Sequence, residues 1–346
     1  MFTLPRLLSR TKPTLTGLDI SSRAIRLVEL HITAKAPPVI VRHASEALPM
    51  DAINNGHIEK IDLVIQTLRD LLEKCGSTAR EVAMNIPACL TTTVLLPVEQ
   101  RVTKPRHTQL TVMAQQALAS LVPYPIQQAC IDIQLPESTQ GNAHQHVLVA
   151  AVHRDCVDDR LAIAEAAGLD LLAIEPDCYA QYATCLRNPG HGLGNTANCT
   201  AQLTGILCID GNALQLALFI SPNASPRMVS LSAPLPQSQR TPDGLARLLP
   251  GLWQRSLELF ATSMPSTTHN SLSEKIILTG PQLATPACQK QMQSVLPPAV
   301  EVSISMPFFG MTLIGDGDTS ILKEHGSPYL TACGLALGLH RQKAAR

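Results

Sequence analysis

Two aspartates in tight turns are the residues of this sequence best placed to take part in chemistry. Asp19 opens the polar break Asp-Ile-Ser-Ser-Arg at 19–23, between two apolar segments. Asp210 opens Asp-Gly-Asn at 210–212, between GILCI and ALQLALFI. Asp, Asn, Gly and Ser favour turns, so each aspartate is predicted at the tip of a β-hairpin. If the two halves of the chain face each other, both carboxylates lie on one cleft.

Other candidates for chemistry are weaker. His144 and His146 lie in a polar stretch without a third ligand nearby in the sequence. Because zinc needs three or four ligands in set geometry, solvent-exposed histidines are the favoured interpretation. The motifs of serine hydrolases, zinc proteases and P-loop NTPases are absent from the sequence. These enzyme classes therefore have no residues to support them.

Composition narrows the class of protein further. The 346 residues carry 27 basic and 27 acidic side chains, a balance that argues against nucleic acid as the main partner. A mean hydropathy of +0.11 excludes a charged disordered chain. No apolar run approaches the roughly 20 residues of a membrane span, and the first residues lack the apolar core of a signal peptide. The ten cysteines are scattered without a C-x-x-C pair, so reduced thiols in a cytosolic protein are expected.

Apolar periodicity predicts alternating strands and helices in the first half. Three consecutive strands are expected at 15–20, 25–32 and 39–48. A helix at 61–75 follows, and further strands are expected at 81–87, 91–97, 123–135, 146–152 and 169–176. Further helices are predicted at 108–121, 155–167 and 177–186.

The second half begins after a loop at 188–198 that is rich in glycine, asparagine and proline. A hairpin is predicted at 205–220, with further strands at 228–235, 275–280 and 301–307. Helices are predicted at 243–263, 285–296 and 328–340, the first of them kinked at Pro250.

The order of these elements repeats one theme twice, a hairpin followed by further strands and helices. It predicts an α/β fold of the actin-like (ribonuclease H-like duplicated) type, with two lobes and a small inserted α+β subdomain. We expect a tail at 1–13 and a first lobe at 14–190 with the insert at about 92–155. The second lobe is expected at 199–346, with a helical part at about 240–265.

Five collinear segments resemble the type IV pilus assembly protein PilM family, also called competence protein ComA in some bacteria and related to the division protein FtsA. They are GLDISSRAIRLVEL, LVPYPIQQACIDIQL, AEAAGLDLLAIEPDCYA, WQRSLELF and KIILTG. The resemblance runs in order from about residue 14 to residue 340. It implies an actin-like fold and a cleft for ATP with Mg²⁺.

The resemblance implies a nucleotide site made of three turns. In the first turn Asp19 would hold Mg²⁺, and Ser21, Ser22 and Arg26 would face the phosphates. The second turn would supply Asp210, again to Mg²⁺, with Gly211 and Asn212. The third would supply Gly280, and Arg255 would stack on or pair with adenine, unless it is simply a surface residue. Glu175 matches a water-orienting glutamate of related proteins, but a polar residue at a strand end is the favoured alternative.

The three turns depart from the family pattern. Ser21 places a Cβ where phosphate would approach the backbone, a position normally taken by glycine. The second turn lacks a following hydroxyl residue, and Pro281 removes a backbone donor from the third. We therefore expect weak or absent ATP binding, and no enzyme.

Three functions are candidates for this chain. The resemblance implies a cytoplasmic scaffold held at the inner membrane by the N-terminal tail of PilN, in a complex with PilO, for pilus biogenesis, twitching motility or DNA uptake. The tail would lie in a groove between the first lobe and the insert. Leu95, Leu96 and the 123–126 stretch edge the insert itself. A homodimer is a further expectation. The alternative is an active ATPase whose nucleotide state switches assembly, which the altered turns disfavour. A polymerising protein like FtsA would need a C-terminal amphipathic membrane helix, and GLHRQKAAR is too short and polar.

Overall fold

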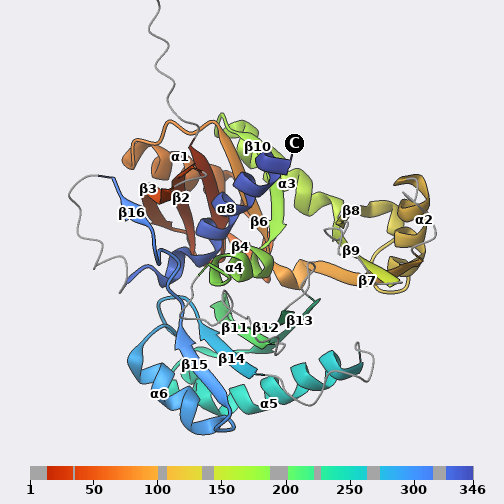
Figure 1. Cartoon of the computed structure of the whole chain (residues 1–346). Helices are drawn as coiled ribbons and strands as arrows, with labels where there is room; N and C mark the ends of the chain where they lie inside the picture. The colour runs from red at the N-terminus through yellow and green to blue at the C-terminus, as the bar shows by residue number, and fades with distance from the viewer. Residues whose placement is uncertain are drawn as a thin grey trace, which may run out of the picture.

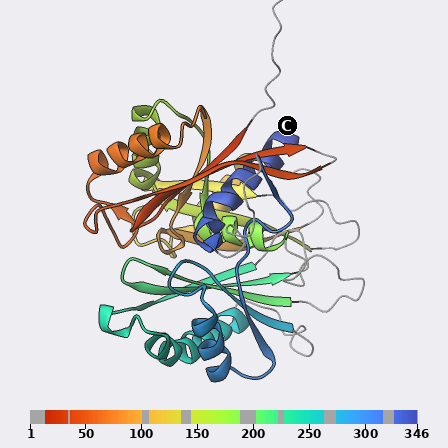
Figure 2. The same cartoon turned by 90° about the vertical axis from the view of Figure 1, so that its left-hand side faces the viewer.

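The computed structural model consists of two main β-sheets with helices between and around them (Figures 1 and 2). A third, smaller sheet projects to one side in Figure 1. The structure describes residues 14–33, 36–99, 107–134, 144–187, 202–221, 227–262, 273–314 and 325–345. The expected tail at 1–13 and the expected lobe boundary at 188–198 lie outside these residues.

The first sheet contains six strands because the three N-terminal strands pair as a meander and later strands add in parallel. Its order is β10 (Asp170–Pro176), β6 (Glu81–Ile86), β1 (Leu15–Ile20), β2 (Ala24–Thr33), β3 (Ala36–Ala47) and β16 (Thr312–Leu313). A separate ribbon of β4 (Ile53–Asn54) and β5 (His57–Ile58) follows β3 along the chain. Strand β1 is buried along its whole length, as its apolar sequence requires.

Helices cover both faces of the first sheet. On one face, α1 (Ile61–Lys74) and α3 (Arg154–Ala166) pack through the apolar stripes seen in the sequence, with Val64, Leu68 and Ile163 against Leu18 and Leu27. On the other face lie α4 (Asp177–Cys185) and α8 (Leu330–Ala345). These two helices fill the space between the first sheet and the second, as Figure 2 shows.

The second sheet has five strands in the order β13 (Arg227–Pro234), β12 (Ala213–Ser221), β11 (Gln202–Asp210), β14 (Ser273–Leu278) and β15 (Val300–Ile304). Its outer face packs on α5 (Pro242–Thr262) and α6 (Pro286–Val295). Its inner face packs on α4, where the rings of Tyr182 and Phe219 stack with centroids 4.3 Å apart. The two sheets are therefore joined by a continuous apolar core.

A three-stranded sheet is built from the segment between β6 and α3. Strands β7 (Thr91–Glu99), β9 (His144–His153) and β8 (Ala129–Gln134) pair in that order, and α2 (His107–Leu118) packs on them through Leu110, Ala114 and Leu118. We call strands β7, β8 and β9 the insert sheet. Because β9 runs directly into α3, the insert sheet is anchored beside β10.

The end of the chain crosses back to the first sheet, which the sequence analysis did not foresee. Strand β16 pairs with β3, and α8 packs on β1, β2 and α4, although residues 199–346 were all assigned to the second lobe. In Figure 1 the blue α8 accordingly lies among the red strands. The physical reason is that α8 is rich in leucine, alanine and glycine on all sides, so it needs a buried position between two layers. Within the described ranges, no helix has both the length and the hydropathy to cross a membrane.

Glycines allow α8 to approach its neighbours closely. A Cβ on Gly334 would lie 1.8 Å from the carbonyl oxygen of Ala180 in α4, and a Cβ on Gly17 of β1 would lie 2.0 Å from that of Ala332. Such distances are far below van der Waals contact, so neither position can hold a larger residue without moving the backbone.

We predict that Gly334→Ala lowers the free energy of unfolding by about 3 kcal/mol or more, because α4 and α8 must separate. Gly251 is the matched control: it is exposed within α5 and a Cβ there would meet nothing within 4 Å. Gly251→Ala should stabilise by about 0.5–1 kcal/mol through helix propensity. Urea titration of the two variants would measure both effects, and equal stability of the two would contradict the close contact.

Candidate functional site

A cavity of about 320 Å³ lies where the two predicted hairpins meet. Strands β1 and β2 form the first hairpin, and β11 and β12 form the second. Asp19 is the last residue but one of β1, and Asp210 is the last residue of β11. Both aspartates line the cavity, as do Ser21, Arg26 and Gly211. The third turn also reaches it through Gly280 and Pro281. The three turns that the sequence analysis singled out therefore converge.

The first turn is already saturated with hydrogen bonds from within the protein. The backbone N–H of Ile20 donates to Asn85 Oδ1 at 2.8 Å, and that of Ser21 to the Ala24 carbonyl at 3.1 Å. The backbone N–H of Ser22 donates to Asp210 Oδ1 at 3.2 Å. These are the groups that would have to face a phosphate. An anion can bind the turn backbone only by displacing one of these acceptors.

Asp210 connects the two hairpins directly. Its Oδ1 accepts hydrogen bonds from both the N–H and the hydroxyl of Ser22. Gly211 has a φ of +56°, which suits glycine, and a Cβ there would lie 3.4 Å from Ser22 Oγ. The turns are therefore in contact, and a second cavity of about 390 Å³, lined by Ser22, Asp210 and Asn212, lies beside the first.

Asp19 is buried and paired. It is 5% exposed, and Arg26 Nη1 lies 3.2 Å from Asp19 Oδ2 and 3.0 Å from the hydroxyl of Ser21. Burial raises the pKa of Asp19 to about 6; Arg26 opposes that rise, and the nearby Asp210 adds to it. Arg26 thus holds the first turn closed instead of extending into open space.

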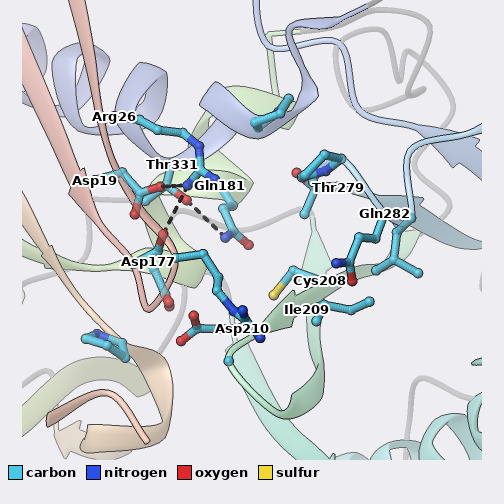
Figure 3. Close-up of a pocket in the computed structure, with 18 of the residues that line it drawn as sticks. Asp19, Arg26, Asp177, Gln181, Cys208, Ile209, Asp210, Thr279, Gln282 and Thr331 are labelled. Atoms are coloured by element: carbon cyan, nitrogen blue, oxygen red, sulfur yellow. Dashed lines mark hydrogen bonds and ion pairs between the residues drawn. The ribbon is translucent and has the colours of Figure 1, made fainter. Parts of the chain in front are cut away.

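A third carboxylate, Asp177, enters the same cavity (Figure 3). It is the first residue of α4, and its Oδ1 accepts hydrogen bonds from the N–H groups of Ala88 and Cys178 at 2.9 and 2.6 Å. Burial, together with the negative charges of Asp210 and Asp19, raises the pKa of Asp177 to about 7. From the sequence, Asp177 was placed only at the start of the helix predicted at 177–186. Its place after a parallel strand, where ligand sites tend to form, was the signal that could have identified it.

Two residues that were predicted for the nucleotide site, Arg255 and Glu175, do not line the cavity. Arg255 is exposed on α5 and does not line the cavity. Glu175 is also outside it: its carboxylate lies against α8, where a Cβ on Gly338 would come within 2.9 Å of Glu175 Oε2. The reason is the break at Pro176, where β10 ends and α4 begins, which brings Asp177 and not Glu175 to the cavity.

The third turn is also closed. Gly280 has a φ of +88°, and its N–H donates to Ser327 Oγ at 2.9 Å, while the Thr279 hydroxyl donates to the Ser327 carbonyl at 3.1 Å. Ser327 begins the 3₁₀ turn Ser327–Tyr329 that leads into α8, so the return of the chain to the first sheet also fixes the third turn. The sequence analysis missed Arg23, Asn85, Gln181, Arg240 and Thr331, which line the cavity too. Each comes from a different element, so no local motif connects them.

Two carboxylate oxygens of the cavity are suitable ligands for a magnesium ion. Within the described residues, Asp19 Oδ1 and Asp210 Oδ2 accept no hydrogen bond, and Mg²⁺ is commonly bound by one or two carboxylates with water and phosphate. Across the described ranges, no group of three or more His, Cys, Asp or Glu side chains has the geometry of a metal site. His144 and His146 lie at the start of β9. All nine cysteines of these ranges are free.

An apolar groove of about 400 Å³ forms a second candidate site. It lies between β8 and β9 of the insert sheet, α3 and β10, with Ile131, Leu161 and Leu172 among its lining residues. Of the described residues that line it, Asp132 alone is charged. Strands β8 and β10 are each at the edge of their sheet, so an extended peptide could pair with either.

The residues that were expected to edge the insert are not the residues that line the groove. Leu96, Tyr124 and Ile126 pack against the core of the insert sheet beneath α2, and neither they nor Leu95 line the groove. The residues that do line it come from β8, β9, α3 and β10, which lie far apart in the sequence.

A sequence model of the family described as type IV pilus assembly protein PilM matches residues 17–204, more than half of this chain. The chain belongs to that family. A solved structure described as a PilM-PilN type IV pilus biogenesis complex is similar over 95% of this chain and 98% of its own, with a TM-score of 0.74 and 19% identity. The predicted two-lobed actin-like fold is thereby confirmed.

The ethanolamine utilization protein EutJ from Carboxydothermus hydrogenoformans matches more loosely, with a TM-score of 0.46 and 12% identity over 94% of this chain and 89% of its own. That likeness is too distant to inform the site.

The raised pKa of Asp177 predicts a pH-dependent stability. Because the folded protein holds this proton more tightly than the unfolded chain does, stability should fall as pH rises from about 4 to about 7. Asp177→Asn keeps the oxygen that accepts from Ala88 and Cys178. It should therefore stabilise the protein at pH 8, on the order of 1–3 kcal/mol, and have no effect at pH 4.

Thermal unfolding from pH 4 to pH 8 would measure this difference. The matched control is Asp170→Asn, an exposed aspartate at the start of β10, which should keep the wild-type pH profile. A constant offset for Asp177→Asn across the pH range would contradict a titrating carboxyl at this position.

Proposed function

We propose that this chain is a cytoplasmic scaffold of the type IV pilus inner-membrane assembly platform that binds the N-terminal tail of PilN. Membership in the PilM family supports a role in type IV pilus assembly. The apolar groove beside β10 is the observation that supports peptide binding. Attachment to the membrane would come through this partner, in a complex that includes PilO.

The groove suits an extended, mostly apolar tail. Two sheet edges supply backbone partners, while Leu161 and Leu172 are 47% and 39% exposed and so have apolar surface left to cover. A basic residue in the tail would complement Asp132. Burying such a tail would remove apolar area from water without rearranging the core.

The proposal keeps the domain division inferred from the sequence, with one change. The tail is 1–13, the first lobe is 14–190 with the insert at 92–155, and the second lobe begins at 199. Because β16 and α8 pack on the first sheet, residues 312–313 and 330–345 are assigned to the first lobe.

The cleft has a structural role in this proposal. ATP with Mg²⁺ would be held by Asp19 and Asp210 around the metal, which would supply charge neutralisation for the phosphates. The N–H groups of Ile20, Ser21 and Ser22 in the first turn are occupied, Ser21 carries a Cβ, and Pro281 supplies no donor. We infer that the chain is not an enzyme. The alternative, an ATPase that switches pilus assembly, requires those turn groups to be free.

The groove predicts a matched set of variants. Leu161→Asp and Leu172→Asp should each weaken binding of a PilN tail peptide at least tenfold, because an unpaired charge would be buried under the peptide. Leu259→Asp is the control: Leu259 is also 47% exposed but lies on α5, away from the groove. It should leave the affinity unchanged in a calorimetric titration.

Asp210→Asn tests the alternative in the same titration. If the state of the cleft does not change peptide binding in the groove, the affinity of Asp210→Asn for the peptide should stay within a few-fold of the wild-type affinity. Loss of peptide binding in Asp210→Asn equal to that in Leu161→Asp would show that the cleft controls assembly.

We also predict no ATP turnover. Phosphate release by the purified chain with ATP and Mg²⁺ should equal that of buffer, because the N–H groups of Ile20, Ser21 and Ser22 in the first turn already donate within the protein and cannot position the phosphates. Asp210→Ala and Asp177→Ala serve as preparations matched for contamination. A steady rate that either substitution abolishes would establish the ATPase alternative.

A further inference from the structure

Two glutamines of α6 bind the backbone of β15, the outermost strand at one side of the second sheet. Strand β15 pairs with β14 on one side, and α6 lies beside it (Figure 1). Gln289 Nε2 donates to the Val302 carbonyl at 2.9 Å, and Gln293 Nε2 donates to the Val300 carbonyl at 2.8 Å. The N–H of Val302 donates to Gln293 Oε1 at 2.9 Å. Three backbone groups at the edge of the sheet are therefore occupied by side chains.

The amide of Gln293 takes the place of a peptide group. It donates to one residue of β15 and accepts from the residue two positions further along the strand. A residue of a neighbouring parallel strand would make the same two bonds, since the backbone groups that face one neighbour recur at every second residue. Gln289 is four residues earlier, on the same side of α6, and supplies a third bond. The two glutamines thus imitate the edge of a further strand.

The edge that these glutamines cover is otherwise suited to pairing with a strand. Val300 and Val302 are 0% and 4% exposed, so unpaired backbone groups there would be costly. The sequence Val-Glu-Val-Ser-Ile at 300–304 has the β-branched residues that favour strands, and it has no proline. An open cavity of about 350 Å³, lined by Gln289, Gln293 and Val302 among others, lies along this edge. Another chain can therefore approach the edge from solvent.

We propose that Gln289 and Gln293 keep a second copy of this chain from pairing with β15. An uncovered edge strand is a template for another strand, and the same edge of a second molecule is self-complementary in an antiparallel dimer. Pairing of two copies about Val302 would place Glu301 opposite Ser303, so the two acidic side chains would not face each other. The glutamines therefore decide whether this edge is open. The groove beside β10 takes no part in this contact, so the proposal does not depend on peptide binding.

Sedimentation velocity of the full chain over a range of concentrations tests this proposal. The double variant Gln289→Ala/Gln293→Ala should dimerise at a concentration at least about tenfold lower than wild type does. Gln291→Ala is the matched control, because it removes a glutamine of the same helix that makes none of the three bonds to β15. This control should sediment as wild type does.

Hydrogen–deuterium exchange identifies the surface through which the variant dimerises. In dilute solution, residues 300–304 should exchange faster in the double variant than in wild type, because the Val302 N–H has lost its acceptor. At concentrations where dimers form, exchange in 300–304 should slow again, and exchange in 170–176 at the groove should not change. If the double variant does not fold, Gln293→Ala, which keeps the bond from Gln289, should show the same changes to a smaller degree.

Equal dimerisation of the double variant and wild type would overturn the proposal. A dimer of the variant that leaves exchange in 300–304 unchanged would overturn it as well, since that dimer would form through another surface. Dimerisation of Gln291→Ala to the same degree would show that the loss of any glutamine on α6, and not the opening of β15, causes association.

Discussion

The contact of Asp210 with Ser22 determines how the two halves of the molecule face each other. One carboxylate oxygen of the second hairpin accepts from both the N–H and the hydroxyl of the first. This contact divides the space between the hairpins into two cavities and occupies the turn backbone that a phosphate would need. A carboxylate from within the chain thus takes the place of an external anion, which stabilises the closed arrangement without a ligand.

The layers around this contact depend on α8. Its small residues let α4 and β1 approach to distances that leave no room for a Cβ at Gly17 or Gly334. Helix α4, so placed, carries Asp177 into the cleft at its first residue and Tyr182 onto the second sheet further along. The strand that leads into α4, β10, forms the edge of the groove. The cleft and the groove are therefore two sides of one rigid segment, β10–α4, although their ligands would be different.

Local patterns in the sequence were enough to predict the two hairpins, because Asp19 and Asp210 lie in short polar turns between strongly apolar strands. They were also enough to give the boundaries of most helices to within a few residues. They could not show that Arg23 and Arg240 share a cavity, since the two are brought together by packing of distant elements. The choice of Asp177 over Glu175 depended on where β10 ends, which a single residue, Pro176, decides. The position of α8 was missed because an apolar helix gives no sign of which layer will cover it.

The central claim is that this chain works through its groove and that the cleft holds the lobes together. Hydrogen–deuterium exchange with and without a PilN tail peptide tests it most directly. The account predicts slower exchange in 129–134 and 170–176, at the two sheet edges of the groove, with unchanged exchange in 19–26 and 209–213. Slower exchange confined to the two hairpins, with no change at the sheet edges, would contradict it.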